Sequence, residues 1–181
     1  MRYFVFVFFS LFSHSVIAQP VPTYEQLLKL TPELRFVDSG HITTTFTNKI
    51  PVDSLTIKKI FPNFYDSRSR DLVRANNYLV AKIISFTDYD LILFLNESKV
   101  HDDSINKYIF LISFTKEGKY LDQITIAWNA LGEKSPHGDT WFFKDGSFFI
   151  YTQLNTDGTD FLSSITKYKT NEYGIFVFYP N

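Results

Sequence analysis

The segment Tyr108-Ile-Phe-Leu-Ile-Ser-Phe-Thr-Lys-Glu-Gly-Lys-Tyr-Leu-Asp-Gln-Ile-Thr-Ile126 decides the fold of this chain. Two runs rich in aromatic and aliphatic residues flank a charged turn that ends in Gly118, which predicts two antiparallel strands joined by a tight turn. Gly118, Gly146 and Gly174 recur at intervals of 28 residues, and one interval earlier the position is occupied by Asp90. A turn residue repeated at a fixed interval is typical of repeated supersecondary units.

The repeat predicts four hairpins between residues 78 and 179. Their strand pairs are 78–87 with 91–97, 107–115 with 119–128, 140–143 with 147–154, and 161–170 with 175–179. Each predicted turn has three loop residues and ends in Gly or Asp. This composition suits a type I turn followed by a residue in the left-handed region, where Gly has no steric penalty.

Several strands are apolar on both faces, for example Leu91-Ile-Leu-Phe-Leu95. A sheet with one solvated face would show polar residues at every second position, so parts of both faces must be covered. We therefore predict an all-β protein, an antiparallel up-and-down meander of about ten strands that forms a curled sheet, a barrel or a sandwich.

A single short helix is predicted at the N-terminal end of the domain, where Thr23 and Gln26 have capping-box spacing. The β-branched run 41–47 and the segment 54–60 are predicted to be strands. Residues 61–77 are expected to be irregular, apart from an optional short helix over 71–77.

The N-terminus has the pattern of a signal peptide that is removed after Ala18. We expect residues 19–181 to form a single domain, exported to the periplasm or secreted, and not embedded in a membrane after cleavage. The chain contains no Cys, so its core must hold without disulfides. A formal net charge of −1 argues against general nucleic-acid binding.

A cluster of basic residues is the main candidate for a partner-binding site. Arg68, Arg70 and Arg74 lie within seven residues of one another, and Lys58 and Lys59 precede them. Arg binds carboxylate and phosphate groups bidentately, so this cluster predicts an anion-binding or protein-binding patch. A solvated loop is the competing interpretation.

Aromatic residues on neighbouring predicted strands could line a site for a small apolar ligand. The candidates are Trp128, Trp141, Tyr120, Tyr151 and Tyr168. If the sheet closed into a barrel, these rings would suit an apolar ligand in its interior. An ordinary aromatic core is the competing interpretation.

Two links between hairpins carry a His close to a carboxylate. His101 with Asp103, and His137 with Asp139, would lie at the same end of a regular meander and could hold a divalent cation. The sequence contains no zinc-protease spacing, P-loop, dinucleotide fingerprint or nucleophile elbow, so we expect no cofactor and predict no catalytic residue.

The segment Phe110-Leu-Ile-Ser-Phe-Thr-Lys-Glu-Gly-Lys-Tyr-Leu-Asp122 resembles the strand–turn–strand units of exported β-meander and propeller-like proteins of Gram-negative bacteria. The shared pattern is an aromatic and aliphatic strand, a charged turn ending in Gly, and then Lys-x-Leu-Asp. The resemblance implies a fold and no activity.

These observations favour an exported, non-catalytic binding protein, for example a periplasmic inhibitor or an immunity-type partner of another protein. The alternative is a carrier that holds a small apolar ligand inside a β-barrel. A hydrolase that uses the histidines and nearby aspartates has no support beyond residue type.

Overall fold

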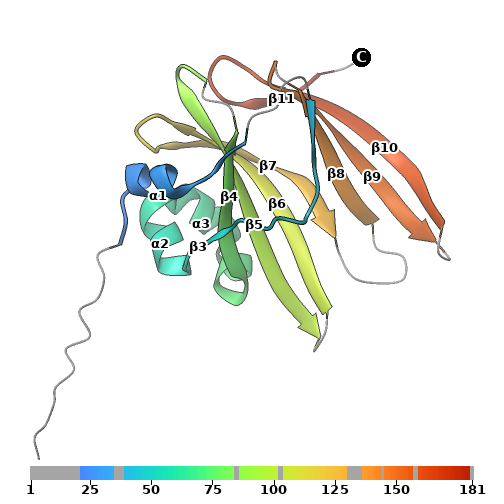
Figure 1. Ribbon diagram of the computed structural model, residues 1–181, viewed down its shortest axis with the longest axis horizontal. Coiled ribbons are helices and arrows are strands. Elements are labelled where there is room, and N and C mark those ends of the chain that lie inside the picture. The colour runs from blue at the N-terminus through green and yellow to red at the C-terminus, as the bar shows by residue number, and fades with distance from the viewer. Residues whose placement is uncertain are drawn as a thin grey trace, which may run out of the picture.

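The computed structural model describes residues 21–34, 39–83, 86–101, 104–129, 136–143, 145–156 and 159–179. These residues form one sheet of eleven strands, which does not close, and three helices (Figure 1). The strands are β1 (Glu33–Leu34), β2 (Ser39–Ile42), β3 (Ile50–Pro51), β4 (Asn76–Ile83), β5 (Tyr89–His101), β6 (Ser104–Thr115), β7 (Tyr120–Asn129), β8 (Pro136–Phe143), β9 (Ser147–Thr156), β10 (Thr159–Thr170) and β11 (Phe176–Phe178). The helices are α1 (Tyr24–Leu30), α2 (Ser54–Ile60) and α3 (Pro62–Arg74).

The prediction of a mostly antiparallel β protein is therefore confirmed, whereas the barrel alternative is wrong because the sheet stays open. Its strand order is β1-β4-β5-β6-β7-β8-β9-β10-β11, with β3 also paired to β4 and β2 to β8. Only the β1–β4 pair is parallel among the described pairs. The predicted signal peptide lies outside the described residues.

The turn chemistry follows the repeat at three of its four positions. Gly118, Gly146 and Gly174 have φ values of +85°, +81° and +79°. The amide of each donates to the carbonyl three residues earlier, at 2.9 to 3.0 Å. This left-handed conformation favours Gly because a Cβ there is strained, and it joins β6 to β7, β8 to β9, and β10 to β11.

The predicted turn over residues 88–90 is wrong, because Tyr89 and Asp90 already belong to β5. The Asp90 carboxylate is buried and accepts hydrogen bonds from the Lys116 ammonium at 2.7 Å and from the Tyr24 hydroxyl at 3.4 Å. Burial, and secondarily this carboxylate, raise the pKa of Tyr24 far above its ordinary value. Asp90 therefore does not form a turn as the three glycines do; its hydrogen bond with Tyr24 attaches α1 to the sheet.

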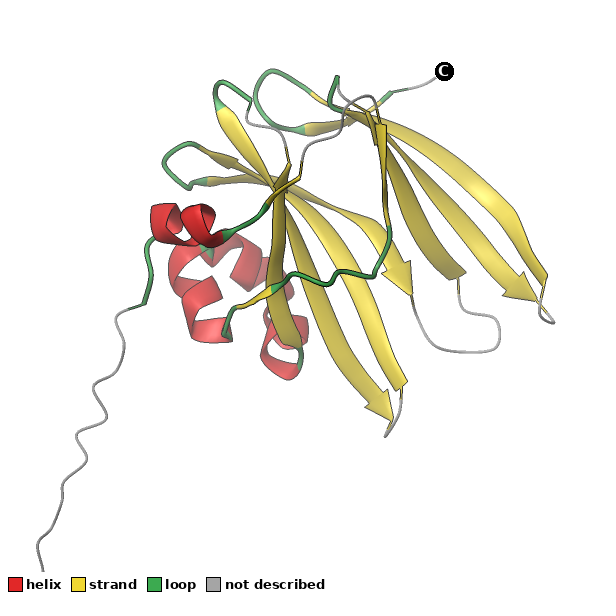
Figure 2. Cartoon of the chain, in the orientation of Figure 1, coloured by secondary structure: helices red, strands yellow, loops and turns green. Residues whose placement is uncertain are grey.

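The sheet has two halves, which meet at a narrow junction. Among the described residues, β7 pairs with β8 only at Trp128–Gly138 and Asn129–His137. On either side of this junction, β4–β7 and β8–β11 are each joined by longer ladders. In Figure 2 the helices all lie beside the first half, and the second half diverges from it.

Both faces of the first half are covered, as the two-sided apolar strands predict. Alternate β5 residues Leu91, Leu93 and Leu95 pack in a cluster with Ile42 of β2 and with Phe142, Phe148 and Ile150 of β8 and β9. The intervening residues Ile92 and Phe94 pack in a second cluster with the helices. The first half is therefore a middle layer between the helices and the second half.

Helix α1 begins where the capping box predicts. The Gln26 amide donates to the Thr23 hydroxyl at 3.3 Å, and the Thr23 amide donates to Oε1 of Gln26 at 2.8 Å. The helix ends at Leu30, before the Thr31-Pro32 step, which disfavours helical conformation at residue 31. Tyr24 and Leu27 are its buried side chains.

The strand predicted over residues 54–60 is wrong, because this segment is α2, and the segment predicted to be mostly irregular holds α3 over residues 62–74. The optional helix over 71–77 coincides with α3 as far as Arg74. Asp53 caps α2, with its Oδ1 accepting from the Thr56 amide at 2.8 Å. Leu55 is 73% exposed, whereas Ile57, Phe61 and Phe64 are buried apolar residues. Their spacing of four and three residues is the helical period, which continues across Pro62 at the start of α3.

Asp53→Ala is expected to lower the free energy of unfolding by about 1 kcal/mol at neutral pH, because it removes this cap. The hydrogen bonds from Thr56 hold the pKa of Asp53 below its ordinary value. A carboxylate with a lowered folded-state pKa contributes stability above its unfolded pKa, and this contribution is lost as the pH falls through the folded pKa. The difference in free energy of unfolding between wild type and variant should therefore shrink as the pH is lowered. Urea unfolding at a series of acidic pH values measures this difference.

Asp66→Ala is the matched control, because Asp66 is an exposed acid on α3. Its expected effect stays within about 0.5 kcal/mol. Equal losses in the two variants would show that charge, and not the cap, is responsible.

Candidate functional site

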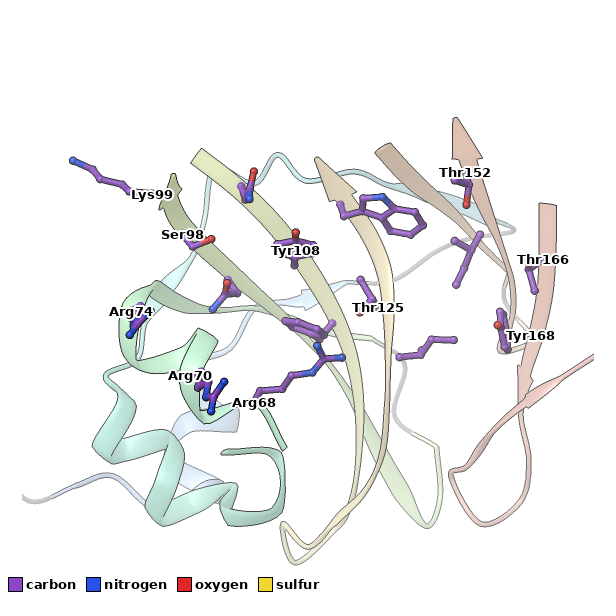
Figure 3. A pocket seen from close by; sticks show the side chains of 16 residues that line it. Arg68, Arg70, Arg74, Ser98, Lys99, Tyr108, Thr125, Thr152, Thr166 and Tyr168 are labelled. Carbon is purple, nitrogen blue, oxygen red and sulfur yellow. The ribbon is translucent and has the colours of Figure 1, made fainter. Parts of the chain in front are cut away.

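A groove of about 1050 Å³ opens between α3 and the sheet (Figure 3). Its lining comes from α3, β5, β6, β7, β9 and β10. It therefore extends from the helix-covered half of the sheet to the second half. We call it the basic groove, because four of its lining residues are cationic: Arg68, Arg70, Arg74 and Lys99.

Helix α3 positions the three arginines. Buried Phe64 and Leu72 anchor the helix to the sheet. The helix is interrupted at Arg68, whose φ of −134° and ψ of 15° are not helical. The Arg68 guanidinium lies 5.1 Å from the centre of the Phe110 ring, within the range of a cation–π interaction. Arg70 and Arg74 are exposed and line the groove from the second part of the helix.

Among the described residues, no acidic side chain is paired with the arginines of the basic groove. None of its lining residues is acidic, and within the described part of the chain none of the three arginines forms an ion pair. Glu97 adjoins the lining residues of β5, but its carboxylate is paired with Lys49 at 2.9 Å and with Lys107 at 3.6 Å. The groove therefore has an excess of positive charge.

Two buried amide side chains fix the C-terminal end of α3 against the sheet. The amide nitrogen of Asn77 donates to the carbonyls of Leu72 at 2.7 Å and Ala75 at 3.1 Å. Asn96 of β5, which lines the groove, donates to Oδ1 of Asn77 at 3.0 Å. These contacts hold the backbone beside Arg74 at a defined distance from the groove floor.

The rest of the lining is aromatic, aliphatic, hydroxyl-bearing or amide-bearing. Tyr108, Phe110 and Trp128 come from β6 and β7, and Tyr168 comes from β10. The remaining lining residues are Ile124, Ile150, Thr125, Thr152, Thr166, Ser98, Asn96 and Asn106. Six of the sixteen lining residues are aromatic or aliphatic and ten are polar or charged, so the groove offers both apolar surface and hydrogen-bonding groups to a ligand.

The structure brings Arg68, Arg70 and Arg74 together, but it separates them from the two predicted lysines. Lys58 and Lys59 are exposed on α2 and do not line the groove. The Lys58 ammonium lies 5.7 Å from the Tyr65 ring, on the helices themselves. The role of the arginines in partner binding stays a prediction, now with a defined surface.

Of the five aromatic residues predicted to line a ligand site, Trp128 and Tyr168 line the basic groove. Trp141 is 42% exposed and stacks on His41, with ring centres 5.1 Å apart. Tyr120 packs beside Phe114 in the helix-side cluster, where burial raises its pKa. Tyr151 also lies outside the lining.

The sequence alone did not identify Tyr108 and Phe110 as lining residues. The alternation of Tyr108 and Phe110 placed both on one face of β6, which was the available signal. What the signal lacked was the location of the helices, because α3 leaves part of that face uncovered.

The proposed metal site is only partly described. The side chain of His101 and the whole of Asp103 lie outside the described residues. Nε2 of His137 lies 2.7 Å from Oε1 of Gln153, and Asp139 lies 3.4 Å from Nε2 of His41. No group of three or more His, Asp or Glu side chains suited to a metal occurs among the described residues.

In the described ranges, no helix combines the length and the apolar character needed to cross a membrane. No protein-family model matches this chain, and comparisons with curated proteins and with solved structures find no match either.

Proposed function

We propose that this chain is an exported, non-catalytic binding protein, and that the basic groove binds a negatively charged partner. One observation carries the proposal: Arg68, Arg70 and Arg74 line a groove of about 1050 Å³ whose lining contains no acidic residue. Arginine donates to carboxylate and phosphate in a fixed fork, and such charge-assisted hydrogen bonds are among the strongest in proteins.

Export is supported by the signal-peptide pattern of residues 1–18. In the periplasm or outside the cell, an inhibitor or immunity-type protein would use the groove to hold an acidic segment of its target. A carrier would use it to hold a small anionic ligand. The size and aromatic lining of the groove favour this second function, with the groove in place of a barrel interior.

The triple variant R68Q/R70Q/R74Q is expected to weaken binding of the natural partner by at least about a hundredfold. Each hydrogen bond to a charged group contributes about 1.5 to 3 kcal/mol, and 1.4 kcal/mol is a factor of ten in affinity. The measurement is native mass spectrometry of the protein isolated from the exported fraction of its host, followed by titration with the partner that it retains.

The matched control is K29Q/K58Q/K59Q, which also removes three positive charges from exposed helix positions but leaves the groove intact. It should bind as the wild type does. The proposal fails if the triple arginine variant retains the partner as well as the control does.

A further inference from the structure

The cations of the basic groove lie toward one end, and the labelled residues at the other end are uncharged. Figure 3 shows Arg70, Arg74 and Lys99 on one side, Arg68 reaching toward the middle, and Thr152, Thr166 and Tyr168 on the other side. Beyond Phe110, the lining has no charged group. A ligand that fills the groove therefore meets positive charge at one end only.

The cationic end suits a single anionic group. Arg70 and Arg74 are exposed on α3, and Arg68 is half-buried above the Phe110 ring. Arg68 thus marks the boundary between the two ends, because its guanidinium contacts an aromatic ring. Within the described part of the chain its guanidinium forms no ion pair, so its donors can bind an oxyanion. Guanidinium groups on one helix can converge on one carboxylate, phosphate or sulfonate.

The opposite end suits an uncharged body. Phe110, Ile124 and Trp128 provide apolar surface on β6 and β7, and Tyr168 provides another ring on β10. The hydroxyls of Thr125 and Thr166 are the kind of polar group that orients a ligand without demanding a charge. The whole volume, about 1050 Å³, is far larger than an inorganic anion needs and lies at the upper end of the range for small-ligand pockets.

We propose that the ligand of the basic groove is a small amphiphile, with one anionic head at Arg68, Arg70 and Arg74 and an aromatic or aliphatic body over Phe110, Ile124 and Trp128. This inference rests on the proposed function and assigns its ligand class. An acidic peptide is the less suitable occupant, because its several carboxylates would require cations along the whole groove.

The first test compares two fluorescent probes that share an aromatic frame. Anilinonaphthalene sulfonate carries one anionic group, whereas phenylnaphthylamine carries none. The sulfonate is expected to saturate one site on the mature protein and to bind at least about tenfold more tightly than the neutral probe, since only it can pair with guanidinium groups. Equal affinities would overturn the inference.

Variants then assign the two ends of the site. R68Q/R70Q/R74Q should lower the affinity for the sulfonate probe by at least about tenfold, because the contact with its anionic head is removed. The affinity for the neutral probe should stay within about threefold of the wild-type value. Thr125→Trp should lower the affinity for both probes, because the larger side chain would occupy the uncharged end of the groove. Thr166→Trp, from the opposite wall, serves the same purpose if Thr125→Trp does not fold, as judged by circular dichroism. Thr47→Trp is the control, because Thr47 is exposed outside the groove.

Competitors separate this inference from the proposed function. Octyl phosphate and octanoate should displace the sulfonate probe, and their relative affinities would show whether a phosphate or a carboxylate head is preferred. A hexapeptide of Asp and Glu, or inorganic phosphate, should displace it weakly. If the peptide binds more tightly than either amphiphile and depends on the arginines, the inference fails and the proposed function stands. If no probe depends on the arginines, both fail.

Discussion

Replacing Gly138 with valine is expected to lower the free energy of unfolding by about 3 kcal/mol, at the upper end of the usual cost of overpacking a core. A Cβ at residue 138 would lie 2.4 Å from Cζ3 of Trp128, and real Cβ atoms do not approach another heavy atom so closely. The conflict falls on the Trp128–Gly138 pair, at the narrow junction where β7 meets β8. Neither strand can move without separating the two halves of the sheet.

A double-mutant cycle tests this cause. Trp128→Leu removes the ring that a new Cβ would meet, so the double variant Trp128→Leu with Gly138→Val should be more stable than the sum of the two single effects predicts. Contacting residues commonly show such coupling, of about 0.5 to 3 kcal/mol. Additive effects in urea unfolding would contradict the steric explanation, as would a wild-type midpoint for Gly138→Val.

The same variant connects the fold to the site. Trp128 lines the basic groove and is held in place against Gly138. Gly138→Val should therefore also lower the affinity for the anionic probe, measured under conditions where the variant remains folded. A stable variant with unchanged probe affinity would show that the position of the Trp128 ring is not important to binding.

Asn77→Ala is expected to lower the free energy of unfolding by about 3 kcal/mol. It removes three hydrogen bonds at 2.7 to 3.1 Å, and it leaves the Leu72 carbonyl and the Asn96 amide without this partner. Asn77 is buried, so water does not readily replace it. An unsatisfied buried polar group costs about 1 to 3 kcal/mol, well above the net contribution of an average hydrogen bond.

Asn76→Ala is the matched control, because it removes the same side chain from an exposed neighbouring position. Its expected effect stays within about 0.5 kcal/mol. Hydrogen exchange of α3 should increase in Asn77→Ala and stay unchanged in the control, since the amide bonds fix the end of this helix. A similar loss of stability in both variants would rule out the buried amides as the cause.

Local chemistry made several features predictable. Gly118, Gly146 and Gly174 adopt left-handed conformations because the three-residue turns between β-strands require them. The capping box at Thr23 and Gln26 forms because both partners lie within one helical turn. The coverage of both sheet faces followed from strands such as 91–95, which have no polar face to present to water.

Other features were decided by contacts that no local pattern contains. Asp90 occupies the repeat position at which Gly118, Gly146 and Gly174 form turns. It belongs to β5 instead, where its carboxylate accepts hydrogen bonds from Lys116 and Tyr24, which are distant in sequence. Residues 54–60 have the composition of a strand, and they form α2 because the Asp53 cap and the burial of Ile57 against the sheet outweigh that preference.

The sequence by itself determined the class of fold, the strand pairing between neighbours and the three arginines as candidate contacts, because each depends on spacing along the chain. Only the tertiary structure decided that Arg68, Arg70 and Arg74 share a groove with Trp128 and Tyr168 and not with Lys58 and Lys59. The physical reason is that the groove is the part of the sheet face that α3 leaves uncovered beside the second half of the sheet. Its lining depends on how helix and sheet pack, a property that no single segment carries.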